Sequence, residues 1–314
     1  MSASDVVGLV DLHCHGALGE EFGSSEAGTR RAIEFLAAEG VERVVASLVS
    51  APEAVLVDRV SVLAPLVAEG VLAGVHLEGP FLSPARRGAH DPAALVPPRA
   101  GLVERLADVA AAAGAPNALQ QWTFAPELPG AHTLIAALAR RGIRPAIGHT
   151  DADATTVTRA VEHCLDATGR APIITHLFNG MPPFHHRAGG PVAAALGAAG
   201  RGEAVVELIA DGVHVAADVV RMVFETIGPH RIALVSDAMA ATGLGDGDYL
   251  LGSMRVRVRQ GTARIADPSG PDGGAIAGST STLARCLTWA VEVAGVDPDA
   301  ALASASTTPA ALLT

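Results

Sequence analysis

Short apolar runs rich in β-branched residues recur along the chain and alternate with longer stretches of Ala, Leu, Arg and Glu. The short runs predict strands buried on both faces, and the longer stretches predict helices that cover them. We expect eight strands, at residues 6–13, 41–49, 72–78, 119–125, 144–149, 172–177, 204–210 and 231–236. We expect helices at residues 25–39, 53–69, 100–113, 131–142, 153–168, 217–227 and 279–294.

This alternation predicts an α/β protein, and eight strand–helix units favour a closed (β/α)8 barrel of the TIM type. A doubly wound sheet is the alternative, but no Gly-x-Gly-x-x-Gly follows the first strand. We expect residues 1–314 to form a single barrel domain with an insertion at about 245–276. Within it, residues 249–265 alternate like a β-hairpin, and residues 267–274 read as a mobile loop rich in Pro, Gly and Asp.

The amino-acid composition limits the functions that the protein can have. A net charge of -11 and an aromatic content of 3% argue against nucleic-acid binding, which favours basic patches and stacking rings. The three scattered cysteines predict no disulfide framework, and no signal segment or apolar run of 18 residues is present. We therefore expect a cytoplasmic protein with no membrane partner. All 22 basic residues are arginine, which excludes Schiff-base lysine chemistry and a carboxylated lysine that bridges two metals.

Chemically useful side chains follow the ends of the predicted strands. His13 and His15 lie two apart at the end of the first strand, so both can point toward one ion. The carboxyl ends of barrel strands converge on one face, where active sites are built. We expect this face to gather residues from six strands, namely His13, His15, Glu78, His149, His176, His214 and Asp237.

Histidine nitrogens and carboxylate oxygens suit Zn²⁺ and neighbouring transition ions. Glu78, His149 and His176 supply three ligands and leave room for a water, whose pKa such an ion lowers toward about 7. Asp237 is placed to move the proton of that water, and His214 to polarise a substrate carbonyl. Because the chain has no lysine, Glu78 is the natural bridge between two metals.

Ordered motifs along nearly the whole chain resemble the N-acetylglucosamine-6-phosphate deacetylases of the amidohydrolase superfamily. They are DLHCHG (11–16), HLEGPFLSPARRGAHDP (76–92), GHTDA (148–152), THLFNGMPPFHHR (175–187), ELIADGVHV (207–215), LVSDAMAATG (234–243), AGS (277–279) and STTPA (306–310). The HLEGPF…GAHDP and HLFN…HHR segments are specific to that family, whereas Asp-x-His-x-His marks only the superfamily.

The resemblance implies metal ligation by Glu78, His149 and His176, with Asp237 as the acid/base. His13 and His15 are implied as ligands of a second ion, which some family members hold. Substrate contacts are implied for Ala89, His90, Asn179, Gly180, Arg187, His214, Ile276, Ala277 and Gly278. The implied cofactor is one or two divalent ions, Zn first, with Fe, Mn or Co as alternatives. The implied reaction converts N-acetylglucosamine 6-phosphate to acetate and glucosamine 6-phosphate, and the implied assembly is a homo-oligomer, a dimer.

The chain departs from the family pattern in three ways. Gly180 stands where the family often has Ala, and Ala188-Gly189-Gly190 replaces the usual Glu-Pro-Gly. The family usually adds a small β-sandwich built from both chain ends, and the motifs here begin and end so close to the termini that we expect that sandwich to be absent.

Plainer interpretations stay open at this point. His13 and His15 suit a satisfied core, Asp237 a helix N-cap, His214 a surface loop, and Arg187 an exposed basic loop. For Arg187 the alternative is phosphate binding, which rests on the bidentate fit of Arg to oxyanions. Two other functions also remain: an amidohydrolase acting on another N-acyl amino sugar or N-acyl amino acid, and a truncated, inactive barrel that serves as a binding protein.

Overall fold

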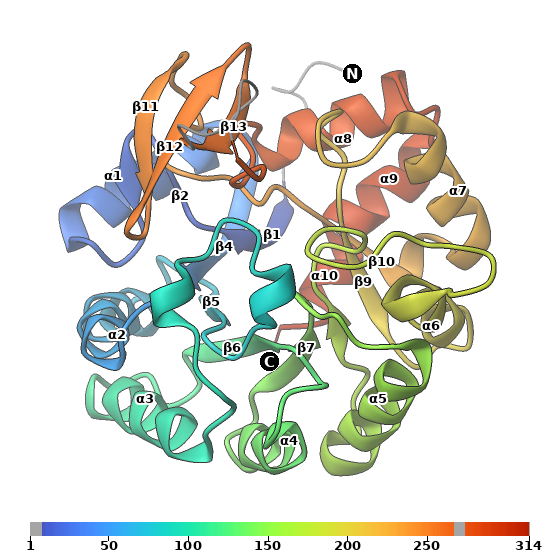
Figure 1. The fold of residues 1–314 in the computed structure, drawn as a ribbon. Helices are drawn as coiled ribbons and strands as arrows, with labels where there is room; N and C mark the ends of the chain where they lie inside the picture. Colours follow the sequence, from blue (N-terminus) through green and yellow to red (C-terminus); the bar gives the residue numbers. More distant parts are fainter. Residues whose placement is uncertain (1–7, 267–273, 314) are drawn as a thin grey trace.

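The computed structural model describes residues 8–266 and 274–313, and eight parallel strands form its main sheet. Each strand pairs with the next one along the chain, so the strands follow their sequence order around a ring with helices outside (Figure 1). They are β1 (Leu9–Cys14), β4 (Val41–Val49), β5 (Gly74–Glu78), β6 (Leu119–Phe124), β7 (Arg144–Ile147), β8 (Ile173–Ile174), β9 (Val205–Ile209) and β10 (Ile232–Val235).

The ring closes between the ends of β1 and β10. The backbone N–H of Asp237 donates to the carbonyl oxygen of His13 at 2.9 Å, and the N–H of His15 donates to that of Ala238 at 2.7 Å. These bonds remove the free edges that an open sheet would expose. The predicted (β/α)8 barrel is confirmed, and the doubly wound alternative is wrong.

The helices surround the strands as the apolar periodicity predicts. They are α1 (Glu26–Ala38), α2 (Glu53–Ala68), α3 (Ala100–Ala112), α4 (Ala131–Arg140), α5 (Ala154–Thr168), α6 (Gly190–Gly200), α7 (Ala217–Ile227), α8 (Leu283–Glu292), α9 (Pro298–Ala305) and α10 (Thr307–Ala310). Side-chain caps set several starts: Ser25 accepts from the Gly28 N–H before α1, and Asp153 from the Thr156 N–H before α5.

Three helices were not predicted from the sequence. Helix α6 reads Gly-Pro-Val-Ala-Ala-Ala-Leu-Gly-Ala-Ala-Gly, which has no polar face and four poor helix formers, so no period of 3.6 is visible. Helices α9 and α10 follow the last predicted helix and are short. Strand β8 is the largest error among the strands, because only Ile173 and Ile174 of the predicted residues 172–177 are paired.

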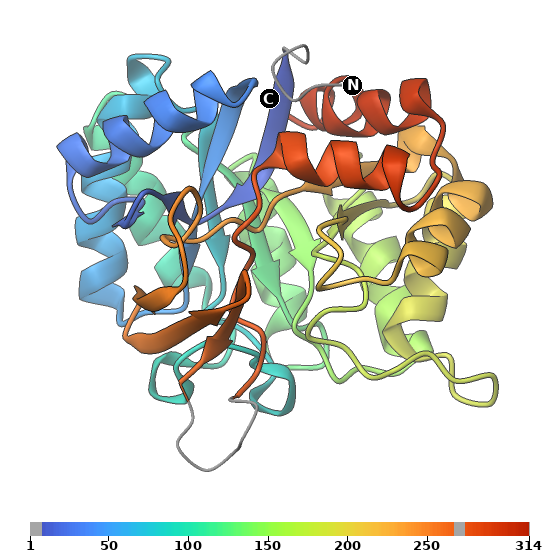
Figure 2. The ribbon, with the colours of Figure 1, turned by 90° about the horizontal axis from the view of Figure 1, so that it is seen from above.

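A second, three-stranded antiparallel sheet follows the barrel strands: β11 (Gly247–Leu251), β12 (Met254–Arg259) and β13 (Thr262–Ile265). The prediction of a hairpin is therefore wrong in strand number, because a second tight turn adds β13. Its inner residues Leu251, Val256, Val258 and Ala263 pack on Ala89 and its apolar neighbours. Figure 2 shows the sheet beside the segment that carries η2 (Pro84–Arg86) and η3 (Pro92–Ala94). The predicted mobile loop at 267–274 lies, except for Gly274, outside the described residues.

Smaller elements complete the described part of the chain. Strands β2 (Gly16–Ala17) and β3 (Glu20–Glu21) form a two-stranded ribbon after β1, and η4 (Pro229–Arg231) precedes β10. Inside the barrel, Val10, Leu12, Val205 and Ala233 form an apolar cluster against which Leu312 packs. No helix within residues 8–266 and 274–313 has the length and apolar character needed to cross a membrane.

Candidate active site

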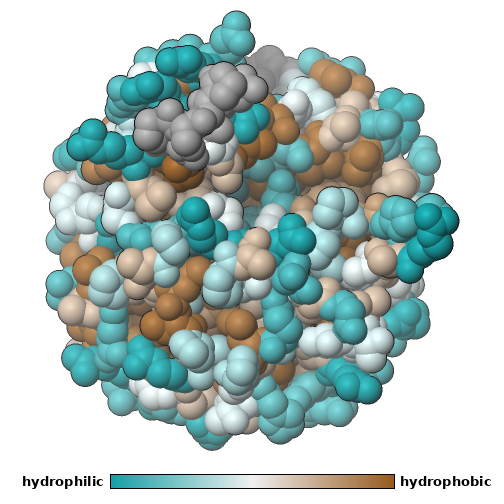
Figure 3. Space-filling view, in the orientation of Figure 1, coloured by the Kyte–Doolittle hydropathy of each residue, from teal (hydrophilic) through white to brown (hydrophobic). Residues whose placement is uncertain are grey.

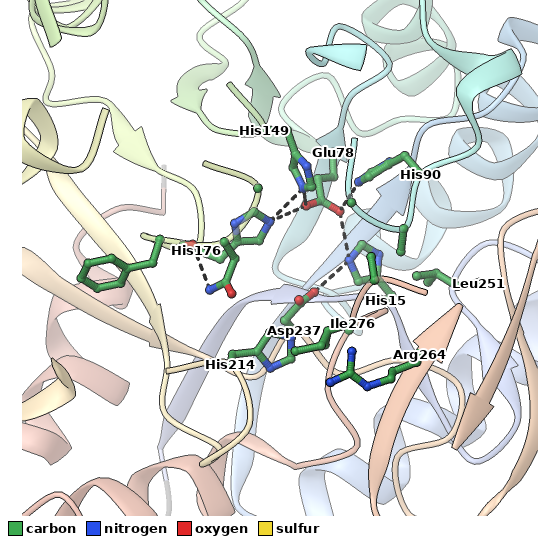
Figure 4. A pocket seen from close by; sticks show the side chains of 17 residues that line it. His15, Glu78, His90, His149, His176, His214, Asp237, Leu251, Arg264 and Ile276 are labelled. Atoms are coloured by element: carbon green, nitrogen blue, oxygen red, sulfur yellow. Dashed lines mark hydrogen bonds and ion pairs between the residues drawn. The ribbon is translucent and has the colours of Figure 1, made fainter. Parts of the chain in front are cut away.

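Three potential metal ligands meet where β5, β7 and β8 end (Figure 4). The Glu78 Oε1 atom lies 3.0 Å from His149 Nε2 and 2.9 Å from His176 Nε2, and the two imidazole nitrogens are 3.1 Å apart. All three residues are buried. A tetrahedral ion about 2.0–2.1 Å from each of three ligands separates the ligand atoms by about 3.3 Å, which is close to these spacings.

The tautomer of His149 shows why this cluster suits a cation. Its Nδ1 lies 2.8 Å from the carbonyl oxygen of Arg86, so Nδ1 carries the proton. In a neutral ring, Nε2 is then a bare lone pair that faces the Glu78 carboxylate. Two acceptors in contact repel, whereas a divalent ion between them turns both into ligands.

A second triad shares Glu78. His13 Nε2 and His15 Nε2 lie 3.2 Å apart, and they lie 3.6 Å from Oε1 and 3.3 Å from Oε2 of Glu78, respectively. His13 Nδ1 is 3.0 Å from Glu207 Oε2, and His15 Nδ1 is 3.2 Å from the Ser47 carbonyl oxygen. Both rings therefore carry the proton on Nδ1 and turn Nε2 toward Glu78, so this donor set also fits a metal.

The charges in the site point the same way. Burial lowers the pKa of His13, but the carboxylates of Glu78, Glu207 and Asp237 outweigh it and raise that pKa well above its usual value. Burial lowers the pKa of His15 too, and hydrogen bonds to Asp237 and Glu78 raise it to about 9. The buried carboxylates thus stabilise positive charge in the site, and metal ions can provide that charge in place of protons.

Asp237 lies two residues after the end of β10 and points toward the second triad. Its Oδ1 atom is 3.2 Å from His15 Nε2 and 3.5 Å from His13 Nε2. Burial acts to raise the pKa of Asp237, but the neighbouring histidines lower it below its usual value. Asp237, His149 and His176 all have positive φ, at 51°, 46° and 26°, a costly conformation for non-glycine residues that concentrates at functional sites.

His214 is held by a carboxylate that the sequence analysis did not single out. Its Nδ1 lies 2.8 Å from Asp211 Oδ2, and its backbone N–H donates to Asp211 Oδ1 at 2.9 Å. The Ser279 hydroxyl also donates to Asp211, at 2.8 Å. Burial lowers the pKa of His214, but the bond to Asp211 raises it above its usual value. The plain surface-loop interpretation of His214 is therefore not needed, since its ring is fixed toward the pocket.

A cavity of about 400 Å³ opens above these residues. Its lining includes most of the residues expected to contact substrate, namely Ala89, His90, Asn179, Gly180, His214, Ile276 and Gly278. It also includes His15, Glu78, His149, His176 and Asp237. Two expected contacts lie elsewhere: Ala277 is fully buried in an apolar cluster, and Arg187 is exposed on the segment before α6.

Three residues near the site were missed. Glu207 orients His13, Asp211 orients His214, and Arg264 lines the cavity from β13. Glu207 interrupts the apolar run Ala-Val-Val-Glu-Leu-Ile-Ala, and a lone acid in a buried strand is a usable signal, because a buried carboxylate needs partners. Arg264 had no comparable signal, since the alternating pattern of residues 249–265 predicts only a hairpin.

The sequence is similar to those of known proteins. The sequence model of the Amidohydrolase family covers residues 6–314. N-acetylglucosamine-6-phosphate deacetylase from Bos taurus is 33% identical over 317 residues, which cover 98% of this chain and 73% of the bovine protein.

Solved structures are similar as well. N-acetyl-D-glucosamine-6-phosphate deacetylase from Mycobacterium smegmatis superposes with a TM-score of 0.88 at 38% identity, over 98% of this chain and 78% of that one. The deacetylase from Thermotoga maritima gives a TM-score of 0.83 at 29% identity, over 98% and 78%. The barrel, the two ligand triads and these matches lead to one conclusion: the chain belongs to the amidohydrolase family of metal-dependent hydrolases.

Proposed function

We propose that this chain hydrolyses the N-acetyl amide of N-acetylglucosamine 6-phosphate and releases acetate and glucosamine 6-phosphate. The observation that carries the proposal is the cluster of Glu78, His149, His176 and Asp237 in one cavity. Relatives with this named activity, which align over 98% of the chain, support the choice of substrate. Neither a different N-acyl substrate nor an inactive binding protein is favoured by any feature of the site.

We assign the ligand roles as follows. Glu78, His149 and His176 hold the first divalent ion, and His13 and His15 join Glu78 around a second. Nitrogen and carboxylate donors in this number favour Zn²⁺, with Fe, Mn or Co as alternatives. When bound there, an ion would supply Lewis-acid chemistry: it would polarise the acetyl carbonyl and make the attacking water more acidic.

The remaining steps belong to side chains. Asp237 accepts a proton from the attacking water at its Oδ1 atom and delivers it to the amide nitrogen as the C–N bond breaks. His214, with Nδ1 bonded to Asp211, presents Nε2 to the substrate and donates a hydrogen bond from it when the ring is protonated. Ala89, His90, Asn179, Gly180 and the Ile276–Gly278 turn orient the sugar, and Arg187 is proposed to contact its phosphate from the exposed segment.

An acetate-release assay on the purified, metal-loaded protein tests the reaction. Asp237→Asn keeps the shape of the side chain but cannot accept the proton, so we expect turnover to fall by roughly 10²–10⁴. Near-normal turnover in this variant would overturn the assigned role. Arg187→Ala is expected to raise KM for the phosphorylated sugar and leave KM for unphosphorylated N-acetylglucosamine nearly unchanged.

We also propose a cytoplasmic homodimer. All three cysteines are free and buried, which suits a reducing compartment. Phe184, Val213 and Met222 are 59%, 40% and 43% exposed, and Figure 3 shows separate apolar patches on the face that it displays. Such residues are common at protein interfaces. Sedimentation equilibrium tests the proposal, and a monomer at micromolar concentration would contradict it.

A further inference from the structure

Asp11 is a buried carboxylate to which the proposed reaction gives no role. It lies on β1, where the ladder to β4 shifts register between Asp11 and Cys14, and it is fully buried. Its Oδ2 atom accepts from the Ser236 hydroxyl at 2.5 Å. Its Oδ1 atom accepts from the backbone N–H groups of Ser236 at 3.2 Å and of His13 at 3.3 Å. Burying a carboxylate is costly, so these hydrogen bonds hold the groups that donate them firmly.

Ser236 extends this contact to both sides of Asp237. Ser236 directly precedes Asp237, and its Oγ atom accepts from the backbone N–H of Ala238, which directly follows Asp237, at 3.0 Å. The Asp11 carboxylate and the Ser236 hydroxyl therefore anchor the backbone before and after the proposed acid/base residue. Asp237 itself has a φ of 51°, a conformation that a non-glycine residue keeps only where the surrounding structure enforces it.

The Ser236 hydroxyl is not needed to close the barrel. The ring closes through main-chain bonds, from the Asp237 N–H to the His13 carbonyl oxygen and from the His15 N–H to the Ala238 carbonyl oxygen. The Asp237 carbonyl oxygen accepts from a third backbone N–H, that of Ser279, at 2.7 Å. None of these bonds uses a side chain. The hydroxyl adds a restraint on the two peptide groups that flank Asp237, and so on the direction of its carboxylate.

We infer that Ser236, held by Asp11, is a positioning residue for Asp237. It fixes the backbone so that Asp237 Oδ1 stays 3.2 Å from His15 Nε2 and faces the cavity. The inference rests on the proposed function, in which Asp237 moves the proton of the attacking water. Proton transfer needs hydrogen-bond reach, about 2.6–3.2 Å between heavy atoms, so a small displacement of this carboxylate lowers the rate. Substrate binding is assigned to other residues and should change little.

Kinetics of Ser236→Ala, with N-acetylglucosamine 6-phosphate as substrate, test this inference. The substitution removes the hydroxyl and leaves the main-chain bonds. A hydrogen bond to a charged group contributes enough that we expect kcat to fall about ten- to hundredfold, with KM nearly unchanged. Ser236→Thr keeps the hydroxyl and should recover most of the loss. Metal content at the Glu78–His149–His176 triad should equal that of the wild type, because these ligands follow other strands.

Ser304→Ala is the control for the loss of a buried hydroxyl. Ser304 is fully buried in α9, and its hydroxyl donates to the Pro229 carbonyl oxygen at 3.1 Å, before β10 begins. This variant should keep the wild-type kcat. Urea unfolding of both alanine variants shows whether each remains folded under the assay conditions. A wild-type kcat in well-folded Ser236→Ala would overturn the inference.

A double-mutant cycle separates positioning from general damage to the site. If Ser236 acts through Asp237, its substitution should lower the residual kcat hardly further once Asp237→Asn has removed the proton acceptor. Effects of independent residues multiply instead. A further ten- to hundredfold loss in the double variant would therefore contradict the inference.

Crystal structures of metal-loaded wild type, Ser236→Ala and Ser304→Ala provide a readout that does not depend on activity. We expect the Asp237 carboxylate to leave its wild-type position relative to His15 only in Ser236→Ala. If the wild-type protein releases no acetate, the deacetylase proposal fails, and this comparison still decides whether Ser236 positions Asp237. An Asp237 carboxylate in the same place in all three proteins would refute the role of Ser236.

Discussion

Glu207→Gln tests how far the second triad depends on a residue that touches no substrate. Glu207 is fully buried in β9. Its Oε2 atom accepts from His13 Nδ1 at 3.0 Å and from the His176 backbone N–H at 3.2 Å, and its Oε1 accepts from Gln121 Nε2 at 3.0 Å. The carboxylate thereby fixes the tautomer of His13 that turns Nε2 toward Glu78.

The size of the effect of Glu207→Gln follows from the hydrogen bonds around residue 207. A glutamine at 207 can keep its oxygen toward His13 and His176, but its amide group then faces the amide group of Gln121. Flipping Gln121 does not relieve the conflict, because Gln121 Nε2 also donates to the Leu12 carbonyl oxygen at 3.2 Å. The first arrangement leaves a buried donor unpaired and the second leaves the Leu12 carbonyl oxygen without its donor, and either costs about 1–3 kcal/mol of the free energy of unfolding. Loss of such an orienting carboxylate lowers metal affinity about 10- to 100-fold.

The assay is a titration of chelator-treated protein with Zn²⁺ in competition with a chromophoric chelator, together with urea unfolding of the metal-free protein. We expect the weaker of two binding steps to weaken further in Glu207→Gln, while the step assigned to Glu78, His149 and His176 changes less. Glu203→Gln is the control, because Glu203 forms a solvent-screened, exposed ion pair with Arg201 at 2.7 Å and lies outside the site. If Glu207→Gln binds Zn²⁺ with wild-type stoichiometry and affinity, the second triad does not depend on Glu207 and the reasoning is wrong.

Three further predictions follow from other contacts. Removing metal with a chelator should abolish acetate release and lower the Tm, because Glu78 then faces imidazole lone pairs, and added Zn²⁺ should restore both; an unchanged Tm would contradict this. Asp211→Asn should lower the free energy of unfolding most between about pH 4 and pH 6.5, because the pKa of Asp211 is lowered below 3.8 and that of His214 is raised above 6.5. The difference from wild type should shrink as rising pH deprotonates His214. A pH-independent difference in urea unfolding would exclude the ion pair. Gly148→Ala should cost about 1–3 kcal/mol in urea unfolding and loosen His149, because a new Cβ would lie 2.6 Å from Thr175 Cβ; Gly101→Ala, in an open position on α3, should be neutral or slightly stabilising.

The barrel could be predicted because its strands are apolar on both faces and its helices have one apolar stripe. Strand β4 matches the predicted residues 41–49, a segment rich in valine between Gly40 and Ser50. The prediction is poorer at β8, where the strand ends at Ile174 and residues 175–177, Thr-His-Leu, lie beyond it. His176 takes a positive φ there, so the backbone turns at the residue whose side chain the site needs. The hydrophobic pattern alone does not predict such a turn.

The candidate ligands were also predictable, because barrel topology converts residues at strand ends into neighbours. The residues that orient them were not, because their roles depend on contacts across the barrel. Glu207 reaches His13 across 194 positions of sequence, and Asp211 is recognisable only once Ser279 and His214 are seen to donate to it. Arg264 shows the same limit for the cavity wall, because the alternating pattern of residues 249–265 predicts a hairpin but not where that hairpin lies relative to the cavity.

The shared carboxylate has a consequence for the order in which ions bind. Contacts among Glu78, His149 and His176 span 2.9–3.1 Å, whereas those among His13, His15 and Glu78 span 3.2–3.6 Å. Both triads lie near the spacing of about 3.3 Å that a tetrahedral ion imposes, and we expect the more compact first triad to fill first. Glu78 then shares its negative charge with that ion, and the two cations repel, so the second step must be weaker. Asp237 lies against the second triad through His15, and an ion there would compete with the proton that Asp237 is proposed to accept. An ion in the second triad should thus lower the proton affinity of Asp237 rather than repeat the role of the first ion.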